Sequence, residues 1–314
     1  MFVDARAAVW ALAALQVAVE RGVIEAVASG HVDPAAIAAE TDLDPVVLRR
    51  LLSVLISYDV LSADGDAIRL TDAGAALAKR GVDVALDAVA TFGQANAFVQ
   101  DARRGDLSSG WVYTDLEVIR AQARMSEQTM ASALPMLLRV IPELERLARP
   151  GARFLDVGVG AAGAAIALCK RFTGLHVVGL EPLPAARLEA RAAIATAGLV
   201  ERIAVRAQRA EDLDEVHVYE AAYVASMFLD DDALAKGLAR VRAALVPGGI
   251  VLFGGWNRPA DPRIEATSAL RWQRWGGGVR TSADAKRIAQ AAGFGDVREG
   301  PPSGDLVPLF ARAG

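Results

Sequence analysis

The chain has 314 residues, of which 53% are hydrophobic and 23% are charged, and its formal net charge is −4. This length fits one large or two modest domains with a sizeable core. The weak negative charge provides no electrostatic footprint for binding nucleic acid or an anionic membrane. The single cysteine, Cys169, excludes an intrachain disulfide and gives no sign of an oxidising compartment.

The N-terminal segment is apolar but lacks the pattern of a membrane or targeting segment. Asp4 and Arg6 precede its apolar run, and Glu20 closes that run before it reaches the roughly 20 residues that a membrane span needs. No small-residue cleavage pattern follows a basic start. We therefore expect a cytoplasmic protein that does not interact with a membrane.

Residues 1–81 have the pattern of a small helical unit that ends in a hairpin. Asp-Pro pairs at 33–34 and 44–45 are typical helix starts. Asp64-Gly65 separates two short β-like runs, which is a hairpin signal. Two helices followed by a hairpin predict a winged helix.

After residue 151 short, nearly continuous apolar runs alternate with helical stretches or turns, as in a parallel sheet covered on both faces. The runs are RFLDVGVG (153–160), HVVGLEP (176–182), RIAVRAQ (202–208), EAAYVASMF (220–228) and GGIVLFGGW (248–256). A helix and two further strand candidates close the chain. This order predicts an α/β fold, with a Rossmann-like, doubly wound, mostly parallel seven-stranded sheet preceded by an all-helical, winged-helix N-terminal domain. We expect domains over 1–110 and 151–314, joined by linking helices over 111–150.

The segment from Gly158 to Gly163 is a complete G-x-G-x-x-G after the first of these strands. Such a turn lets the backbone approach a ligand and opens a helix N-terminus. Two acids accompany it. Asp156 ends the first strand, and Glu181 ends the second, where a carboxylate can accept both ribose hydroxyls. Because Asp156 would repel a dinucleotide pyrophosphate, a nicotinamide dehydrogenase is disfavoured. S-adenosylmethionine, with its ammonium, sulfonium and adenosine ribose, suits these acids.

The segments FLDVGVGAAG, GLEP, LVPGGIVLFGGW and AAGFGDV resemble successive motifs of class I S-adenosylmethionine-dependent methyltransferases. Together with the N-terminal unit and VIRAQARMSEQTM, they make nearly the whole chain similar to bacterial small-molecule O-methyltransferases with an N-terminal winged-helix dimerisation domain. The resemblance implies an enzyme that transfers a methyl group from S-adenosylmethionine to a small molecule. It also implies a homodimer, formed through the first domain, and a cofactor-binding domain over 151–314. We expect no metal site.

The resemblance also indicates which residues bind the cofactor. They are Asp156, Gly158, Gly160, Gly163, Glu181, Arg209, Ala210, Ser226 and Met125. Arg209 stands in the register where the family usually has an acid near the adenine, so the adenine contact shifts by a residue or two. Core packing is the alternative role for Met125.

Ser226 stands where these O-methyltransferases commonly carry the histidine that deprotonates the acceptor. His31, His176 and His217 are not placed to replace it. Asp230 and Asp231 are the candidate catalytic carboxylates, with helix capping as the alternative. Without a base, positioning alone can carry methyl transfer to a strong nucleophile, because a sulfonium is already a good leaving group.

The expected substrate pocket lies beyond the carboxyl ends of the strands, where ligands bind in open α/β sheets. Its candidate residues are Phe228, Trp256, Asn257, Met227, Trp111 and Tyr113. Trp272 and Trp275 are three residues apart, a spacing more typical of packing or of a dimer contact. The aromatic residues favour a flat, apolar acceptor.

Two further functions remain open. A protein of this fold can use S-adenosylmethionine for chemistry other than methylation, and the missing histidine keeps that alternative open. A winged-helix regulator is disfavoured, because residues 1–81 hold seven basic and eleven acidic side chains, and DNA binding requires phosphates to be neutralised.

Overall fold

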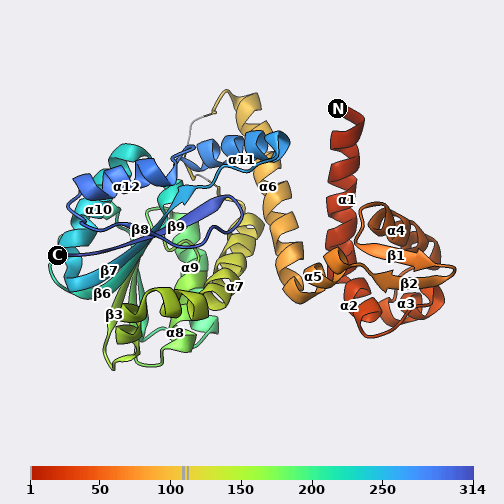
Figure 1. The fold of residues 1–314 in the computed structure, drawn as a ribbon, viewed down its shortest axis with the longest axis horizontal. Coiled ribbons are helices and arrows are strands. Elements are labelled where there is room, and N and C mark those ends of the chain that lie inside the picture. Colours follow the sequence, from red (N-terminus) through yellow and green to blue (C-terminus); the bar gives the residue numbers. More distant parts are fainter. Residues whose placement is uncertain (1, 108–109, 112) are drawn as a thin grey trace. The chain divides into compact units, whose positions relative to one another are not determined.

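The computed structural model describes residues 2–107, 110–111 and 113–314 and divides into two compact units, Met1–Ala95 and Asn96–Gly314 (Figure 1). The boundary falls inside helix α6 (Val82–Arg104). The predicted boundaries were residue 110 for the end of the first domain and residues 111–150 for the linking helices. Residues 96–150 instead group with the sheet, because the long helix α7 (Leu116–Val140) packs on the sheet's own helices.

The N-terminal unit contains the expected pair of helices followed by a hairpin. Its elements are α1 (Phe2–Glu20), α2 (Val23–Ala28), α3 (Pro34–Thr41), α4 (Pro45–Ser57), β1 (Leu61–Asp64), β2 (Ala67–Leu70), α5 (Asp72–Arg80) and the first part of α6. The Asp-Pro pairs start helices as predicted: Asp33 accepts a hydrogen bond from the backbone of Ala36, and Asp44 accepts from those of Val46 and Val47. The two strands pair antiparallel.

The second unit is built on a seven-stranded sheet. Its strands are β3 (Arg153–Val157), β4 (His176–Leu180), β5 (Ile203–Arg206), β6 (Tyr219–Val224), β7 (Leu245–Trp256), β8 (Arg298–Glu299) and β9 (Leu306–Arg312). The strand order is β5-β4-β3-β6-β7-β9-β8, with β9 antiparallel to both of its neighbours and the other pairs parallel. This confirms the Rossmann-like, mostly parallel sheet.

Helices cover both faces of this sheet (Figure 1). The remaining helical elements are η1 (Pro142–Ala148), α8 (Gly163–Arg171), α9 (Pro184–Thr196), η2 (Ala210–Asp212), η3 (Ser226–Phe228), α10 (Asp231–Ala244), α11 (Pro262–Trp275) and α12 (Ser282–Ala291). Leu155 and Val157 point into a core with α10 and α12, whereas Phe154 points into the core with α7, α8 and α9. The alternation of side chains along β3 therefore divides the apolar interior into two layers.

Candidate active site

The glycine loop between β3 and α8 is shaped by three residues in the left-handed region. Gly158 has φ 80°, Gly160 has φ 56° and Ala162 has φ 68°. Glycine is favoured at 158 for a second reason, since a Cβ there would lie 3.1 Å from the Cβ of Ala225. The loop follows the carboxyl end of β3, on the side of the sheet where ligands of such sheets bind.

Glu181 is joined to the glycine loop by hydrogen bonds. Its Oε2 accepts from the backbone N–H of Gly160 at 3.0 Å, and its Oε1 accepts from that of Leu183 at 2.9 Å. Burial raises the pKa of Glu181, and the two backbone hydrogen bonds and the charge of Arg187 oppose that rise. Each carboxylate oxygen can accept a further hydrogen bond. Glu181 is therefore placed, beside the glycine loop, to accept ligand hydroxyls.

Asp156 is a buried carboxyl with an unsatisfied oxygen. The residue is 2% exposed, and its Oδ2 has no hydrogen-bond partner. Burial, together with the charge of Glu181, raises the pKa of Asp156 to about 7. Buried polar atoms are nearly always paired, so an oxygen without a partner beside a glycine loop fits a ligand that brings a donor. An ammonium group would supply both the donor and the opposite charge.

Tyr223, which was not among the predicted site residues, is a neighbour of Asp156. The two residues are direct partners in the pairing of β3 with β6. Burial, together with the charge of Asp156, raises the pKa of Tyr223 and keeps its phenol neutral. The alternating pattern of β6 could have indicated its direction, because Tyr223 lies two residues from Ala221 on the same face.

Gly163 and Met125 are related by the packing of α7 on α8. A Cβ on Gly163 would lie 1.9 Å from the backbone oxygen of Ala123 and 2.9 Å from the backbone nitrogen of Glu127. The structure thus shows a helix-packing role for Gly163, and its predicted contact with the cofactor stays a prediction. Met125 is half-buried on α7, between the two residues that crowd Gly163.

Arg209 and Ala210, which were predicted to bind the cofactor, have side chains with other partners in the structure. The side chain of Ala210 is buried against α10, where a Cβ on Gly237 would lie 2.9 Å from it. Arg209 is exposed and pairs with Glu211 through an Nε–Oε1 contact of 2.7 Å. The side chain of Ala210 thus lies in the core and that of Arg209 in a surface ion pair, and their contact with adenine stays a prediction.

Ser226 holds two strands together. It is fully buried, and its hydroxyl donates to the carbonyl of Gly254 at 2.7 Å and accepts from the amide of Gly254 at 2.9 Å. Ser226 was predicted to bind the cofactor, and its hydroxyl is hydrogen-bonded to Gly254 of β7. The serine at which the resemblance predicted a missing histidine thus packs within the fold. Two of the three histidines lie at the amino ends of strands: His176 begins β4 and His217 precedes β6. Asp156 lies near the carboxyl end of β3, so these histidines and Asp156 are at opposite ends of the parallel strands.

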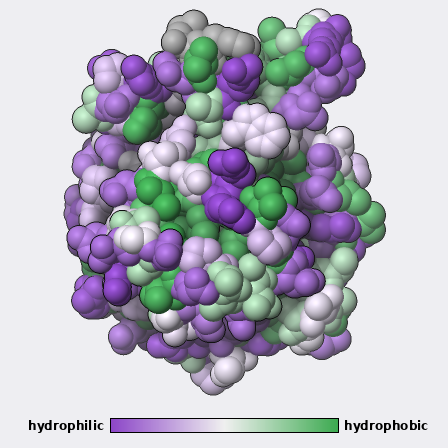
Figure 2. All heavy atoms as spheres, turned by 90° about the vertical axis from the view of Figure 1, so that its right-hand side faces the viewer, coloured by the Kyte–Doolittle hydropathy of each residue, from purple (hydrophilic) through white to green (hydrophobic). Residues whose placement is uncertain are grey.

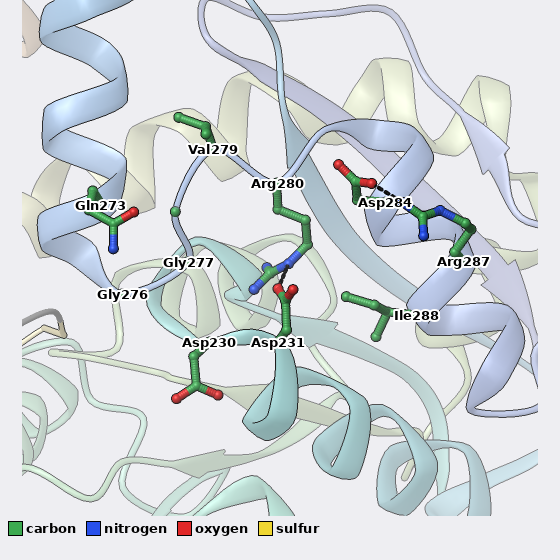
Figure 3. A pocket seen from close by; sticks show the side chains of 11 residues that line it. Asp230, Asp231, Gln273, Gly276, Gly277, Val279, Arg280, Asp284, Arg287 and Ile288 are labelled. Atoms are coloured by element: carbon green, nitrogen blue, oxygen red, sulfur yellow. Dashed lines mark hydrogen bonds and ion pairs between the residues drawn. The ribbon is translucent and has the colours of Figure 1, made fainter.

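Asp230 and Asp231 lie at the start of α10, in a cleft of about 510 Å³ (Figure 3). Asp230 caps the helix by accepting from the amide of Ala233 at 2.8 Å. Asp231 accepts from the Nε of Arg280 at 2.7 Å. The capping role that the sequence left open for these acids is present for Asp230, and Asp231 is an ion-pair partner. The cleft is lined by Asp230, Asp231, Gln273, Gly276, Gly277, Gly278, Val279, Arg280, Asp284, Arg287 and Ile288.

Four aromatic rings form a cluster next to η3. The ring of Trp111 lies 4.7 Å from that of Tyr113 and 4.8 Å from that of Phe228. Trp275 joins them, at 5.5 Å from Phe228 and 6.4 Å from Trp111. Sequence spacing had suggested packing or a dimer contact for Trp275, whereas the structure places it against two predicted pocket residues. Trp272 is a packing residue, because it is 2% exposed.

The side chains of Trp256 and Asn257 form hydrogen bonds within the fold and are not part of this aromatic cluster. The indole N–H of Trp256 donates to the hydroxyl of Ser268 on α11 at 3.0 Å. The side-chain amide of Asn257 donates to the carbonyl of Gly304 at 2.8 Å. Met227, by contrast, lies in η3 itself, next to Phe228, and its carbonyl accepts from the amide of Gly277 at 2.9 Å.

Among the residues described here, no group of three or more His, Cys, Asp or Glu side chains is arranged to hold a metal ion. Within the same residues, no helix combines the length and apolarity that crossing a bilayer needs.

Comparison with known proteins identifies both parts of the chain. Residues 154–249 match the family of methyltransferase domains, and residues 5–80 match the family of O-methyltransferase dimerisation domains. No curated protein sequence matches the chain.

Several solved structures share the fold over almost the whole chain. The S-adenosylmethionine-dependent methyltransferase SibL is 21% identical, with a TM-score of 0.65 and coverage of 99% of this chain and 98% of that one. The pyocyanin biosynthetic protein PhzM is 15% identical, with a TM-score of 0.68 and coverage of 100% and 98%. Human N-acetylserotonin methyltransferase, solved in complex with S-adenosylmethionine, is 17% identical, with a TM-score of 0.65 and coverage of 100% and 96%. The chain therefore belongs to the methyltransferases that join an O-methyltransferase dimerisation domain to a Rossmann-like domain with the fold of the S-adenosylmethionine-dependent enzymes.

Proposed function

We propose that this enzyme transfers a methyl group from S-adenosylmethionine to an oxygen or nitrogen of a flat aromatic small molecule. The observation that carries the proposal is the pair of buried carboxyls at the glycine loop. Asp156 has an oxygen without a partner, and Glu181 is hydrogen-bonded to the loop itself. No nucleotide phosphate would be favoured beside these acids.

The methyl donor is S-adenosylmethionine, which supplies a methyl group on a positively charged sulfur and leaves as neutral S-adenosylhomocysteine. Asp156 binds the ammonium, because that group pairs its free oxygen and compensates its charge. Glu181 accepts the ribose hydroxyls, and Gly158 and Gly160 let the backbone approach the ligand. Met125 borders the cofactor from α7.

The acceptor lies against the aromatic cluster of Trp111, Tyr113, Phe228 and Trp275. Stacking and edge contacts with such rings select a planar ring in the acceptor. The hydroxyl or amine of the acceptor forms the new bond to the methyl carbon as the bond from that carbon to the sulfonium sulfur breaks, and the acceptor releases one proton to the solvent. The O-methyltransferase type of the dimerisation domain favours a hydroxyl.

No histidine serves as the base in this proposal. Ser226 occupies the register of the family's histidine, and its hydroxyl is bound to Gly254. Orienting the acceptor in line with the methyl group, in a site sheltered from water, then provides most of the rate enhancement. Effective molarities of roughly 10⁵–10⁸ M are available from such orientation.

The active form is a homodimer built through the first domain. Residues 5–80 match a dimerisation domain, and α1 carries exposed apolar side chains at Val3, Val9 and Trp10. Figure 2 shows hydrophobic side chains interrupting the hydrophilic surface of one face of the molecule. An apolar surface of this kind favours a contact with another protein surface.

We place the enzyme in the cytoplasm, among enzymes of small-molecule biosynthesis, because its one cysteine requires no oxidising compartment.

The test has two steps. Calorimetry should first show that S-adenosylhomocysteine binds the wild-type protein. Incubation with S-adenosylmethionine and a panel of 1-naphthol, 1-naphthylamine and cyclohexanol, analysed by mass spectrometry, should then show methylation of an aromatic compound and not of cyclohexanol. Failure to bind S-adenosylhomocysteine would contradict the proposal. Consumption of S-adenosylmethionine without a methylated product would favour the alternative chemistry that the missing histidine leaves open. A gel shift with DNA at low salt would favour the regulator.

A further inference from the structure

Arg280 connects the ends of two neighbouring strands at the acceptor side of the site. Its backbone carbonyl accepts from the amide of Trp256, the last residue of β7, at 2.7 Å. Its guanidinium reaches the turn η3 that follows β6. The Nη1 donates to the carbonyl of Ser226 at 3.0 Å, and the Nη2 donates to that of Leu229 at 2.7 Å.

The guanidinium is buried although it lies at a charged cleft. Arg280 is 5% exposed, whereas its ion-pair partner Asp231 is largely exposed at the rim (Figure 3). The Nε donates to Asp231 at 2.7 Å, as the dashed line in Figure 3 shows. Three nitrogens of one planar group thus hold three acceptors in fixed directions. A lysine has a single nitrogen, so it cannot reproduce this geometry.

The segment Gly276–Gly278, which precedes Arg280 in the sequence, packs against the same turn. The amide of Gly277 donates to the carbonyl of Met227 at 2.9 Å, and a Cβ on Gly277 would lie 2.6 Å from that oxygen. The turn is therefore held by its backbone from two sides, while the rings of Phe228 and Trp275 meet 5.5 Å apart. The position of Phe228 depends on these backbone contacts.

We propose that Arg280 is a positioning residue for methyl transfer, which fixes the turn from Ser226 to Leu229 so that Phe228 orients the acceptor. This inference rests on the proposed function, because it assigns Phe228 to the acceptor. Arg280 does not touch the acceptor; it acts through the turn. Asp156 lies on β3 and Glu181 directly follows β4, whereas Arg280 contacts the turn after β6 and the end of β7. We therefore expect Arg280 to act on the acceptor and to leave the binding of S-adenosylhomocysteine unchanged.

The test compares Arg280→Lys with Arg287→Lys as the matched control. Arg287 lines the same cleft but is exposed and pairs with Asp284. Hydrogen exchange is measured on S-adenosylhomocysteine complexes, at the amides of Phe228 and Leu229. These amides bond to the carbonyls of Ala225 and Ser226. We expect hydrogen exchange at these two amides to be at least tenfold faster in Arg280→Lys and unchanged in Arg287→Lys. In Arg280→Lys, the carbonyls of Ser226 and Leu229 lose the guanidinium that holds them, so the turn opens more often.

Kinetics provide the second arm, with 1-naphthol as the acceptor. Arg280→Lys should lower kcat/KM for 1-naphthol at least tenfold, with the Kd for S-adenosylhomocysteine within threefold of wild type. Added guanidinium ion should restore part of the activity of Arg280→Ala. Exchange equal to wild type, or a parallel loss of S-adenosylhomocysteine binding, would overturn the proposal, as would unchanged kcat/KM. A wild-type protein that binds S-adenosylhomocysteine but methylates no compound of the panel would contradict the proposed function, and the exchange arm would still decide the role of Arg280.

Discussion

The backbone oxygen of Ala123 occupies the space beside Gly163, 1.9 Å from where a Cβ would stand. Helix α7 therefore crosses the first turn of α8 at a distance that only glycine permits. The third glycine of the G-x-G-x-x-G serves this helix contact, and the first two shape the ligand loop through their positive φ values.

We predict that Gly163→Ala destabilises the protein by about 1–3 kcal/mol, because backbone atoms must shift to admit the methyl group. Urea unfolding measures this change. Gly295→Ala is the control, since a Cβ at Gly295 meets no atom within 4 Å, and it should stay within about 0.5 kcal/mol of wild type. Equal stability of the two variants would show that α7 has room to move.

Glu181→Gln should weaken S-adenosylhomocysteine binding by about 1–3 kcal/mol, the cost of losing hydrogen bonds to a charged acceptor. Glutamine keeps the shape of the side chain and one oxygen for the loop amide of Gly160. Calorimetry measures the affinity, and urea unfolding shows whether the fold is retained. Unchanged affinity in the folded variant would remove Glu181 from the ribose site.

Asp156 predicts a pH dependence of ligand binding. Burial and the charge of Glu181 raise the pKa of Asp156 to about 7, so the free protein carries a proton there at pH 6. An ammonium ligand favours the ionised carboxyl, and the proton must leave on binding. The affinity for S-adenosylhomocysteine should therefore fall about tenfold from pH 8 to pH 6. Calorimetry in two buffers of different ionisation enthalpy should detect proton release near pH 6.5.

Asp156→Asn is the control for that titration, and it should abolish this pH dependence. It should also stabilise the ligand-free protein at pH 8 by about 1–4 kcal/mol. The folded protein holds the Asp156 proton more tightly than the unfolded chain does. The free energy of unfolding therefore decreases as the pH rises from 3.8, the ordinary pKa of an aspartate, to about 7. A variant less stable than wild type at pH 8 would contradict this account.

Local patterns predicted most of the fold. The predicted apolar runs form strands β3 to β7, and Asp33 and Asp44 cap the helices that their Asp-Pro pairs predicted. Asp156 and Glu181 were predicted to lie together because one is near the end of β3 and the other directly follows β4. Parallel strands bring such ends to the same side of the sheet.

The direction of single side chains was less predictable. Ala210, Ser226 and Trp256 lie in the expected segments, yet their side chains point into the core or bond to neighbouring elements. A difference of one residue in register changes the face on which a side chain lies. Trp275 and Arg280 were missed because their partners, Phe228 and Leu229, lie about 50 residues earlier in the sequence, and no local pattern encodes such contacts.

Trp10→Glu should weaken self-association. Trp10 is 71% exposed on α1, within the residues that match a dimerisation domain, and a charge there would oppose the burial of an apolar surface. Light scattering at micromolar concentration should give a dimer for wild type and a smaller mass for the variant. Val200→Glu changes an equally apolar residue, 64% exposed in the other unit, and should leave the dimer intact. A monomeric wild-type protein would refute the dimer itself.

The histidines and Asp230 test whether methyl transfer depends on a dedicated base. With 1-naphthol as the acceptor, we expect His31→Ala, His176→Ala and His217→Asn to keep kcat within about tenfold of wild type. Asparagine is chosen for His217 because φ is 55° there, a conformation that asparagine tolerates.

Asp230→Asn completes this test. The substitution removes the charge but keeps a side-chain oxygen that can accept from the amide of Ala233, and asparagine also caps helices. Its kcat should likewise stay within about tenfold, since positioning supplies most of the rate. A loss of about 10³-fold or more, with S-adenosylhomocysteine binding intact, would instead identify Asp230 as the base. The same loss in His217→Asn would mean that the strand end carrying His217, and not the one carrying Asp156, faces the acceptor.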